Sequence, residues 1–193
     1  MPPSTADSAL RKMALLETTA IPLDLLSSIE RKAVLVLKQH ALVTVDDKDL
    51  VAMHSLTQLA VRGQTDKGDR RGIATAVARA LKERLAKFDH EKPATFFIGR
   101  RYAAHARAAA ANAAAWGIIP GFPALAAPCA AHRGVGRATG GGGEARGGRS
   151  LLGDVLEMCL SAGTFFHTVG AQYQKALDMY EFTLVCTRMW RRP

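Results

Sequence analysis

The chain has 193 residues, of which 48% are hydrophobic, 22% charged and 6% aromatic, and its 26 basic and 17 acidic residues give a net charge of +9. This apolar content is sufficient for a core, and because many of the apolar residues are alanine, we expect helices that pack closely. The basic excess is spread along the chain, which is typical of a solvated surface and does not by itself indicate a nucleic-acid partner.

Cysteine usage and segment composition argue against several classes of protein. The cysteines Cys129, Cys159 and Cys186 are odd in number and lack metal-ligand spacing, so neither a disulfide framework nor a zinc site is expected. The first residues lack the pattern of a signal peptide, and no apolar run is long enough to span a membrane. These features predict a cytoplasmic protein with reduced thiols and no membrane partner.

The first block of the chain, residues 8–63, has the pattern of a small domain that begins with helices. Ser8 can cap a helix with helical spacing of its apolar residues, and Pro22 can open a short second helix. Ser28 is the expected cap of a third helix that ends near His40. The residues of this third helix that we expect to be buried are Ala33, Val34, Leu35 and Leu37.

A β-hairpin and one more helix complete this block. Residues 41–45 are rich in β-branched side chains and are followed by an acidic turn, residues 46–49, and by a second short strand. His54 lies at the junction between this strand and the next helix, where its side chain could simply hydrogen-bond the chain ends. Ser55 is the expected cap of this helix. The apolar residues of this helix are Leu56, Leu59 and Ala60.

The second block, residues 69–115, predicts two helices that form a helical linker. An apolar stripe at helical spacing marks the first helix, and residues 88–93 interrupt the pattern. The second helix is rich in alanine and runs from Ala94 to Ala115. The stripe of the first helix comprises Ile73, Val77, Ala80, Leu81 and Leu85, and the polar positions of the second are Arg100, Arg101, His105 and Arg107.

The last two blocks differ sharply in composition. Residues 116–150 are rich in glycine, proline, alanine and arginine, without periodicity, and we expect this segment to be disordered because it cannot bury enough apolar surface. Its composition also allows a second origin, a misread segment of the gene. Residues 151–190 predict two amphipathic helices joined at Gly170. The expected fold class is therefore mainly α, with one small β-hairpin.

The first block resembles the winged-helix part of NB-ARC-type signalling ATPases, the STAND class, in the subgroup that carries tetratricopeptide repeats. The resemblance rests on residues 21–26, on the strand at 41–45 and on residues 53–62, which begin with Met53-His54. It implies that His54 senses the β-phosphate of bound ADP and holds a closed state. The family motif often continues with aspartate, where this chain has Ser55.

The later blocks extend the resemblance in the expected order. Pro93, the adjacent aromatic residues and the His105-Ala106 pair are similar to the helical segment that links winged helix and repeats, where His105 is a packing residue. Residues 162–181 resemble a first tetratricopeptide repeat, with one extra residue, Ala171, in the turn. In that repeat the packing residues are Tyr173, Ala176 and Tyr180.

The residues required for independent catalysis are missing from the sequence. It contains no G-x-x-x-x-G-K-[ST] phosphate loop, no G-x-S-x-G nucleophile motif and no acidic pair on a strand that could bind magnesium. We therefore expect no enzymatic activity and no cofactor in this chain alone, although the resemblance implies ADP or ATP for intact family members.

Three hypotheses follow from these patterns. The first is a regulatory, protein-binding fragment of a STAND ATPase, with a protein partner on the repeat helices and a nucleotide domain supplied in trans. The second is a nucleic-acid-binding winged helix that uses Arg31, Lys32, Lys38 and Lys48, although the apolar middle of the candidate recognition helix favours its burial. The third is a small helical adaptor, for which His54→Ala would leave every partner interaction unchanged.

Overall fold

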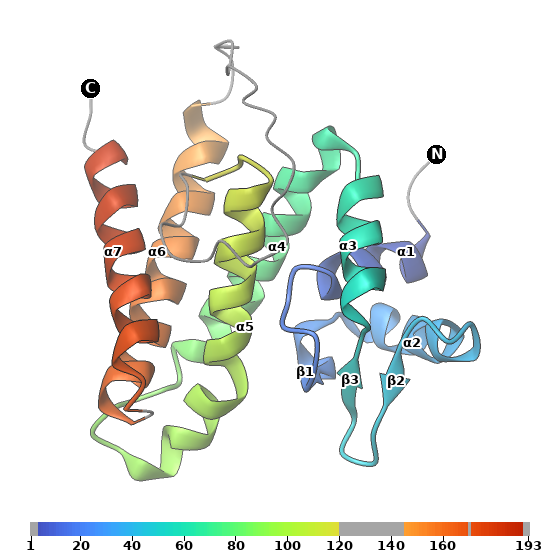
Figure 1. Ribbon diagram of the computed structural model, residues 1–193, viewed down its shortest axis with the longest axis horizontal. Helices are drawn as coiled ribbons and strands as arrows, with labels where there is room; N and C mark the ends of the chain where they lie inside the picture. The colour runs from blue at the N-terminus through green and yellow to red at the C-terminus, as the bar shows by residue number, and fades with distance from the viewer. Residues whose placement is uncertain (1–3, 120–144, 170, 191–193) are drawn as a thin grey trace.

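The computed structural model describes residues 4–119, 145–169 and 171–190, and these form a mainly helical fold with a small antiparallel sheet (Figure 1). The sheet and helices α1 to α3 lie on one side of α4 and α5, and helices α6 and α7 lie on the other. The elements in chain order are α1 (Thr5–Met13), β1 (Ile21–Pro22), the 3-10 turn η1 (Leu23–Leu25), α2 (Ser28–Gln39), β2 (Thr44–Val45), β3 (Leu50–Ala52), α3 (Ser55–Gln64), α4 (Lys67–Leu85), η2 (Pro93–Thr95), α5 (Phe96–Ala115), α6 (Ala145–Thr168) and α7 (Tyr173–Trp190).

The N-caps of the first two long helices precede the expected positions: they are Ser4 rather than Ser8 and Ser27 rather than Ser28. Ser4 caps α1, because its hydroxyl accepts the backbone N–H of Asp7 at 3.2 Å. Ser27 caps α2 in a capping box with Glu30, whose carboxylate accepts the Ser27 backbone N–H at 2.9 Å. A glutamate three residues after a serine is the signature of this motif, and Ser27 fulfils it.

Glu30 also ties α2 to α1. Its side chain is buried, and it accepts hydrogen bonds from the Ser8 hydroxyl at 2.7 Å and the Lys12 ammonium at 2.9 Å. Burial favours a raised pKa, but these hydrogen bonds and those from Ser27 outweigh it and lower the pKa of Glu30 to about 2. The carboxylate is therefore charged at neutral pH and joins the first two helices.

The sheet has the order β1-β3-β2, with both pairs antiparallel. The predicted hairpin is present, and the Asp46 carboxylate closes its turn by accepting the backbone N–H groups of Lys48 and Leu50. Strand β1 was not expected, and in it Ile21 pairs with Val51 of β3. The short helix predicted to open at Pro22 is present as the 3-10 turn η1, for which Pro22 is the N-cap. A strand of two residues has no periodicity that a sequence pattern could reveal.

Helix α2 buries Val34 and Leu37 as expected but exposes Leu35, which is 63% accessible to solvent. Helix α3 departs further from a normal amphipathic helix, because Leu56 and Leu59 are 67% and 56% exposed while Gln58 is buried. An apolar stripe normally marks the buried face of a helix, so α3 presents the opposite face to the rest of the molecule.

The inward face of α3 is polar because it satisfies the C-terminal end of α1. The Gln58 side-chain amide donates to the carbonyl oxygens of Met13 and Leu16, both at 3.2 Å. The Arg62 guanidinium donates to the carbonyl of Ala14 at 2.6 Å. Met13 is the last residue of α1, and Ala14 and Leu16 lie in the segment that follows it, so α3 supplies donors to the carbonyls where α1 ends.

Helices α4 and α5 confirm the two helices predicted between residues 69 and 115. Val77, Leu81 and Leu85 of the predicted stripe are buried. Helix α5 packs through alanines, and at Gly99 it approaches α6 so closely that a methyl group would overlap the Phe165 ring. The expectation of close helix packing around small residues is borne out at this contact.

Helix α6 begins at Ala145, before the expected Leu151, so residues 145–150 are helical rather than disordered. Residues 120–144 of the predicted disordered segment lie outside the described residues. Helix α7 packs on α6, where the Tyr180 ring lies against Gly163. The predicted helical pair between residues 151 and 190 is therefore present.

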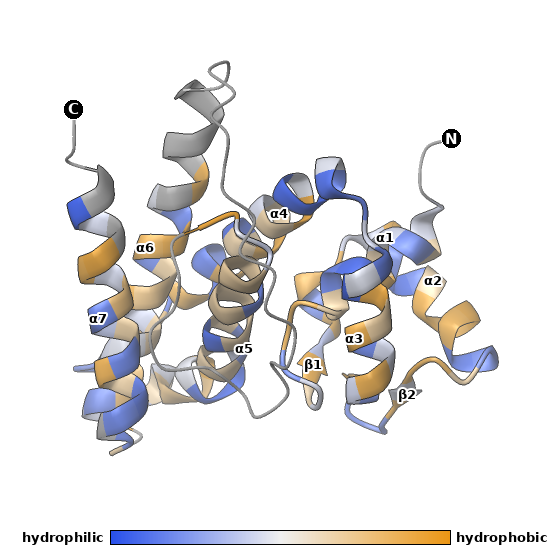
Figure 2. Cartoon of the chain, turned by 45° about the horizontal axis from the view of Figure 1, so that its top comes forward, coloured by the Kyte–Doolittle hydropathy of each residue, from blue (hydrophilic) through white to orange (hydrophobic). Residues whose placement is uncertain are grey.

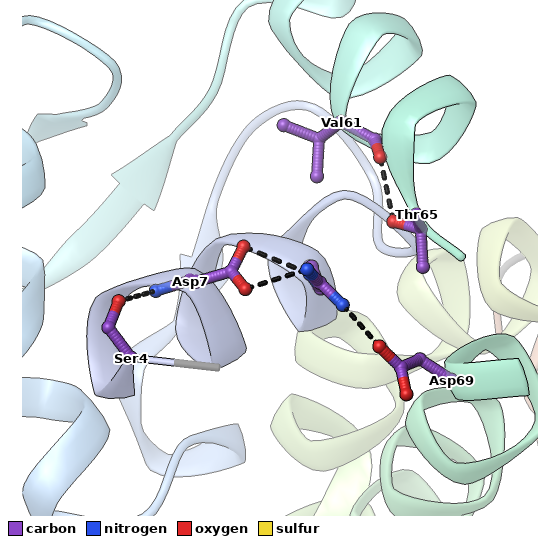
Figure 3. Close-up of polar contacts among 6 residues, drawn as sticks. Ser4, Asp7, Val61, Thr65 and Asp69 are labelled. Carbon is purple, nitrogen blue, oxygen red and sulfur yellow. Dashed lines mark hydrogen bonds and ion pairs between the residues drawn. The ribbon is translucent and has the colours of Figure 1, made fainter. Parts of the chain in front are cut away.

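Ion pairs join the two sides of the molecule to α4. The Arg11 guanidinium of α1 pairs with Asp7 of the same helix and also lies 2.7 Å from the carboxylate of Asp69 in α4 (Figure 3). On the other side, Lys82 of α4 lies 2.9 Å from Asp154 and 3.0 Å from Glu157 of α6. Within the ranges that the structure describes, the helices are either too short or too polar to cross a membrane.

Candidate functional site

His54 occupies the N-terminal cap of α3, directly after β3. Its backbone is extended, and its Nδ1 atom accepts the backbone N–H of Leu56 at 3.2 Å. The expected cap, Ser55, is instead the first residue of the helix. Met53 is buried, and its backbone N–H donates to the carbonyl of Thr18 at 2.9 Å. Because successive side chains of an extended backbone point to opposite sides, the Met53 side chain points inward and the His54 side chain points outward.

An open cavity of about 430 Å³ lies beside His54. Its walls are formed by the segment before β1, the segment that leads into β2, and the end of β3. Apart from His54, the side chains on these walls are apolar or carry hydroxyl groups. The lining residues are Thr18, Thr19, Ala41, Leu42, Val43, Thr44, Ala52, Met53, His54 and Ser55. Since none of them is lysine or arginine, this cavity has no permanent cation to neutralise a phosphate.

The spacing assigned His105 to a polar position of α5 and the resemblance assigned it to packing; the side chain is buried against the loop before β1. Its Nδ1 accepts the backbone N–H of Glu17 at 3.2 Å, so Nε2 carries the proton and donates to the carbonyl of Ala20 at 3.0 Å. The pKa of His105 is lowered, mainly because the side chain is buried. The hydrogen bond to Ala20 and the charge of Glu17 act to raise this pKa, and the charge of Arg101 lowers it slightly further. This geometry gives His105 a structural role in packing.

A second polar junction, which the sequence did not reveal, joins η1 to α4 and α5. The Tyr102 hydroxyl donates to the Asp24 carboxylate, and Arg84 donates to the Asp24 carbonyl at 2.9 Å. Burial and this hydrogen bond raise the pKa of Tyr102 to about 12. Together with the His105 contacts, these bonds fix the sheet side of the molecule against α5.

The residues predicted for repeat packing lie on α7. Ala176 is buried, and the partly buried Tyr180 ring contacts Gly163 of α6, as the interpretation of a helical pair required. The side chain of Tyr173 lies outside the described part of the structure. The extra residue in the turn, Ala171, has a positive φ of 46°.

A second cavity, of about 500 Å³, lies between the sheet and α5 and was not predicted. Its walls include Lys48 of the hairpin and Phe97, Arg100 and Arg101 of α5, and Phe97 is 64% exposed. The sequence does contain a signal for this cavity. Arg100 and Arg101 follow Phe97 by three and four positions, and this spacing places all three residues on one face of a helix.

The described side chains include no group of three or more His, Cys, Asp or Glu residues that could hold a metal ion. No protein-family model matches the chain, and no curated protein or solved structure shows significant similarity to it.

Proposed function

We propose that this chain is a non-catalytic regulatory and protein-interaction fragment of a STAND ATPase that carries tetratricopeptide repeats. Residues 8–63 are a winged helix, residues 69–115 a helical linker and residues 151–190 a first repeat. The order helix, strand, short helix, helix, strand, strand, with the first strand paired to the third, is that of a winged helix and supports the proposal.

The observation that carries a protein-binding role is the apolar surface of α2 and α3. Ile29, Leu35 and Val36 on α2 are 65%, 63% and 46% exposed, and Leu56 and Leu59 on α3 exceed half exposure. Figure 2 shows hydrophobic residues in both α2 and α3. Five large aliphatic side chains on two helices that both contact α1 are more than an isolated exposed residue, and exposed apolar surfaces are typical of contacts with another protein.

The surroundings of His54 support a shared nucleotide site rather than an independent one. Nδ1 of His54 is used by the helix cap, whereas Nε2 is the atom that would meet a ligand. The adjacent cavity lacks lysine and arginine, so the phosphates of ADP would be neutralised by a nucleotide domain in trans. In this arrangement His54 couples the nucleotide state to the position of the winged helix.

The exposed face of α7 supports a repeat that continues. Leu177 and Leu184 lie seven residues apart on one face and are 48% and 50% exposed. A single repeat leaves such a face uncovered, and a following helical hairpin would bury it.

Titration calorimetry with ADP tests the nucleotide part of the proposal. We expect no saturable binding at micromolar concentration by the chain alone, and binding by a protein that also contains the product of the reading frame upstream of Met1. In that longer protein, His54→Ala should weaken ADP binding and Ser55→Ala should not. Saturable ADP binding by the chain alone, or an upstream frame without a phosphate loop, would contradict the proposal.

The second candidate is a nucleic-acid-binding winged helix, and the exposed lysines Lys32 and Lys38 of α2 favour it. The three exposed aliphatic residues on the same helix oppose it, because a recognition helix presents polar side chains to base edges. Retention on DNA that falls steeply with added salt would support this candidate, and no retention at low salt would remove it.

A further inference from the structure

We propose that a groove along α5 binds an acidic peptide segment of a partner protein, one that also carries a bulky apolar side chain. The groove consists of the cavity of about 500 Å³ between the sheet and α5 and a second cavity of about 390 Å³ between α5 and the α6–α7 turn. Arg100 and Ala104 line both, so the two cavities meet at these residues. This site is separate from His54 and does not depend on the proposed link to a nucleotide.

The charge of the groove is strongly asymmetric. Lys48, Arg100 and Arg101 line the first cavity and Lys175 lines the second, whereas Glu17 is the one carboxylate on their walls. Among the described residues, none of these four cations has an ion pair, and Lys175 instead lies over the Phe166 ring at 5.7 Å. The turn that carries Lys48 also contains aspartates, but they are not among the lining residues. The groove therefore offers unpaired positive charge.

Apolar surface lies between these cations. Phe97 is exposed on one wall of the first cavity, beside Leu50 and Ala104, and Phe165, Phe166 and Val169 line the second. A ligand that only supplied negative charge would leave this surface uncovered. A peptide that alternates acidic and large apolar side chains would satisfy both parts of the groove, because an extended chain places successive side chains on opposite sides.

Charge also argues against two basic segments of this chain as occupants. Residues 116–150 contain four arginines and one glutamate, and the chain ends in Arg191-Arg192-Pro193, so both segments repel the groove. A single-stranded nucleic acid fits less well than a peptide, since it requires a series of stacking platforms, whereas Phe97 is the one strongly exposed aromatic residue of the described surface.

The test is fluorescence anisotropy of a labelled synthetic peptide in which glutamates alternate with leucine and phenylalanine, titrated with the full chain. We expect saturable binding that weakens with added salt. The double variant Arg100→Glu/Arg101→Glu should lower the affinity about tenfold or more, and Phe97→Ser should lower it several-fold. The matched control, Lys32→Glu/Lys38→Glu on α2, makes the same change in net charge away from the groove and should change the affinity less than about twofold.

Circular dichroism melts establish that each variant remains folded, which is expected because the substituted side chains are exposed. Absence of binding by the unaltered chain at low salt would overturn the proposal. So would equal losses in the groove and control variants, equal binding of a peptide with glutamine in place of glutamate, or tighter binding of single-stranded DNA in competition with the peptide. Peptide-independent self-association through the groove, seen by sedimentation and lost in Arg100→Glu/Arg101→Glu, would assign the groove to a second copy instead.

Discussion

Helices α3 and α5 bury opposite kinds of surface. Helix α3 turns Gln58 and Arg62 inward and leaves Leu56 and Leu59 in solvent, whereas α5 buries its alanines and directs Arg100 and Arg101 outward. The difference arises from what each helix meets. Helix α5 meets the apolar faces of α4 and α6, whereas α3 meets the open carbonyl end of α1, which requires donors.

The comparison shows that the residue type of an exposed face does not follow from the helix alone. Helix α5 buries its alanines and leaves Phe97 and two arginines exposed, whereas α3 exposes Leu56 and Leu59. Exposed aliphatic side chains are also present on α2.

The largest expected effect concerns the close approach of α5 to α6. Gly99→Ala places a methyl group into the Phe165 ring, and we expect a loss of about 2 to 3 kcal/mol in the free energy of unfolding. Gly72→Ala on α4 is the matched control, because no atom lies within 4 Å of the new methyl group and alanine favours a helix. Urea denaturation of both variants distinguishes the two positions, and equal stability would show that α5 is not tightly packed.

A smaller effect is expected from the arginines of the two helices. Arg62→Met removes the donor to the Ala14 carbonyl from a half-buried position, where burial lowers the pKa of Arg62, and should cost about 1 to 2 kcal/mol. Arg101→Met on α5 removes an exposed guanidinium and should change stability by less than about 0.5 kcal/mol. If the two substitutions have the same effect on chemical denaturation, the polar face of α3 is not what holds it to α1.

The pH dependence of stability provides a third measurement on α5. The pKa of His105 is lowered by burial below the value of 6.5 that applies to the unfolded chain, so the unfolded state binds the additional proton first. Stability is therefore complete above pH 6.5 and declines as the pH falls through this value. His105→Gln should flatten the difference in unfolding free energy between about pH 7.5 and 5.5. An unchanged slope would mean that another group is responsible.

The sequence predicted the elements whose stability comes from repeated apolar spacing. Helices α4 and α5 and the pair α6 and α7 were found in this way, and the β2–β3 hairpin followed from β-branched residues and an acidic turn. Strand β1 could not be predicted, because two residues carry no period and its pairing with β3 is a tertiary contact.

Apolar spacing alone could not predict which face of α3 is buried or which groups His105 contacts, for one physical reason, although the resemblance assigned His105 to packing. Gln58, Arg62 and His105 are polar by residue type, but each is buried or half-buried because it satisfies a backbone group distant in the sequence. Periodicity measures apolar spacing and does not contain information about which carbonyls elsewhere in the fold lack donors. The position of His54 between strand and helix was predicted correctly, while its role as the cap was assigned to Ser55.

The most direct test of this account exchanges the two faces of α3. Gln58→Leu increases apolar content at a buried position but removes the amide that donates to the carbonyls of Met13 and Leu16, and should destabilise the chain by about 2 kcal/mol. Leu59→Gln decreases apolar content at an exposed position and should change the unfolding free energy by less than about 0.5 kcal/mol. Urea denaturation that gives the reverse order, with Leu59→Gln the more damaging, would contradict the claim that α3 buries its polar face and exposes its apolar one.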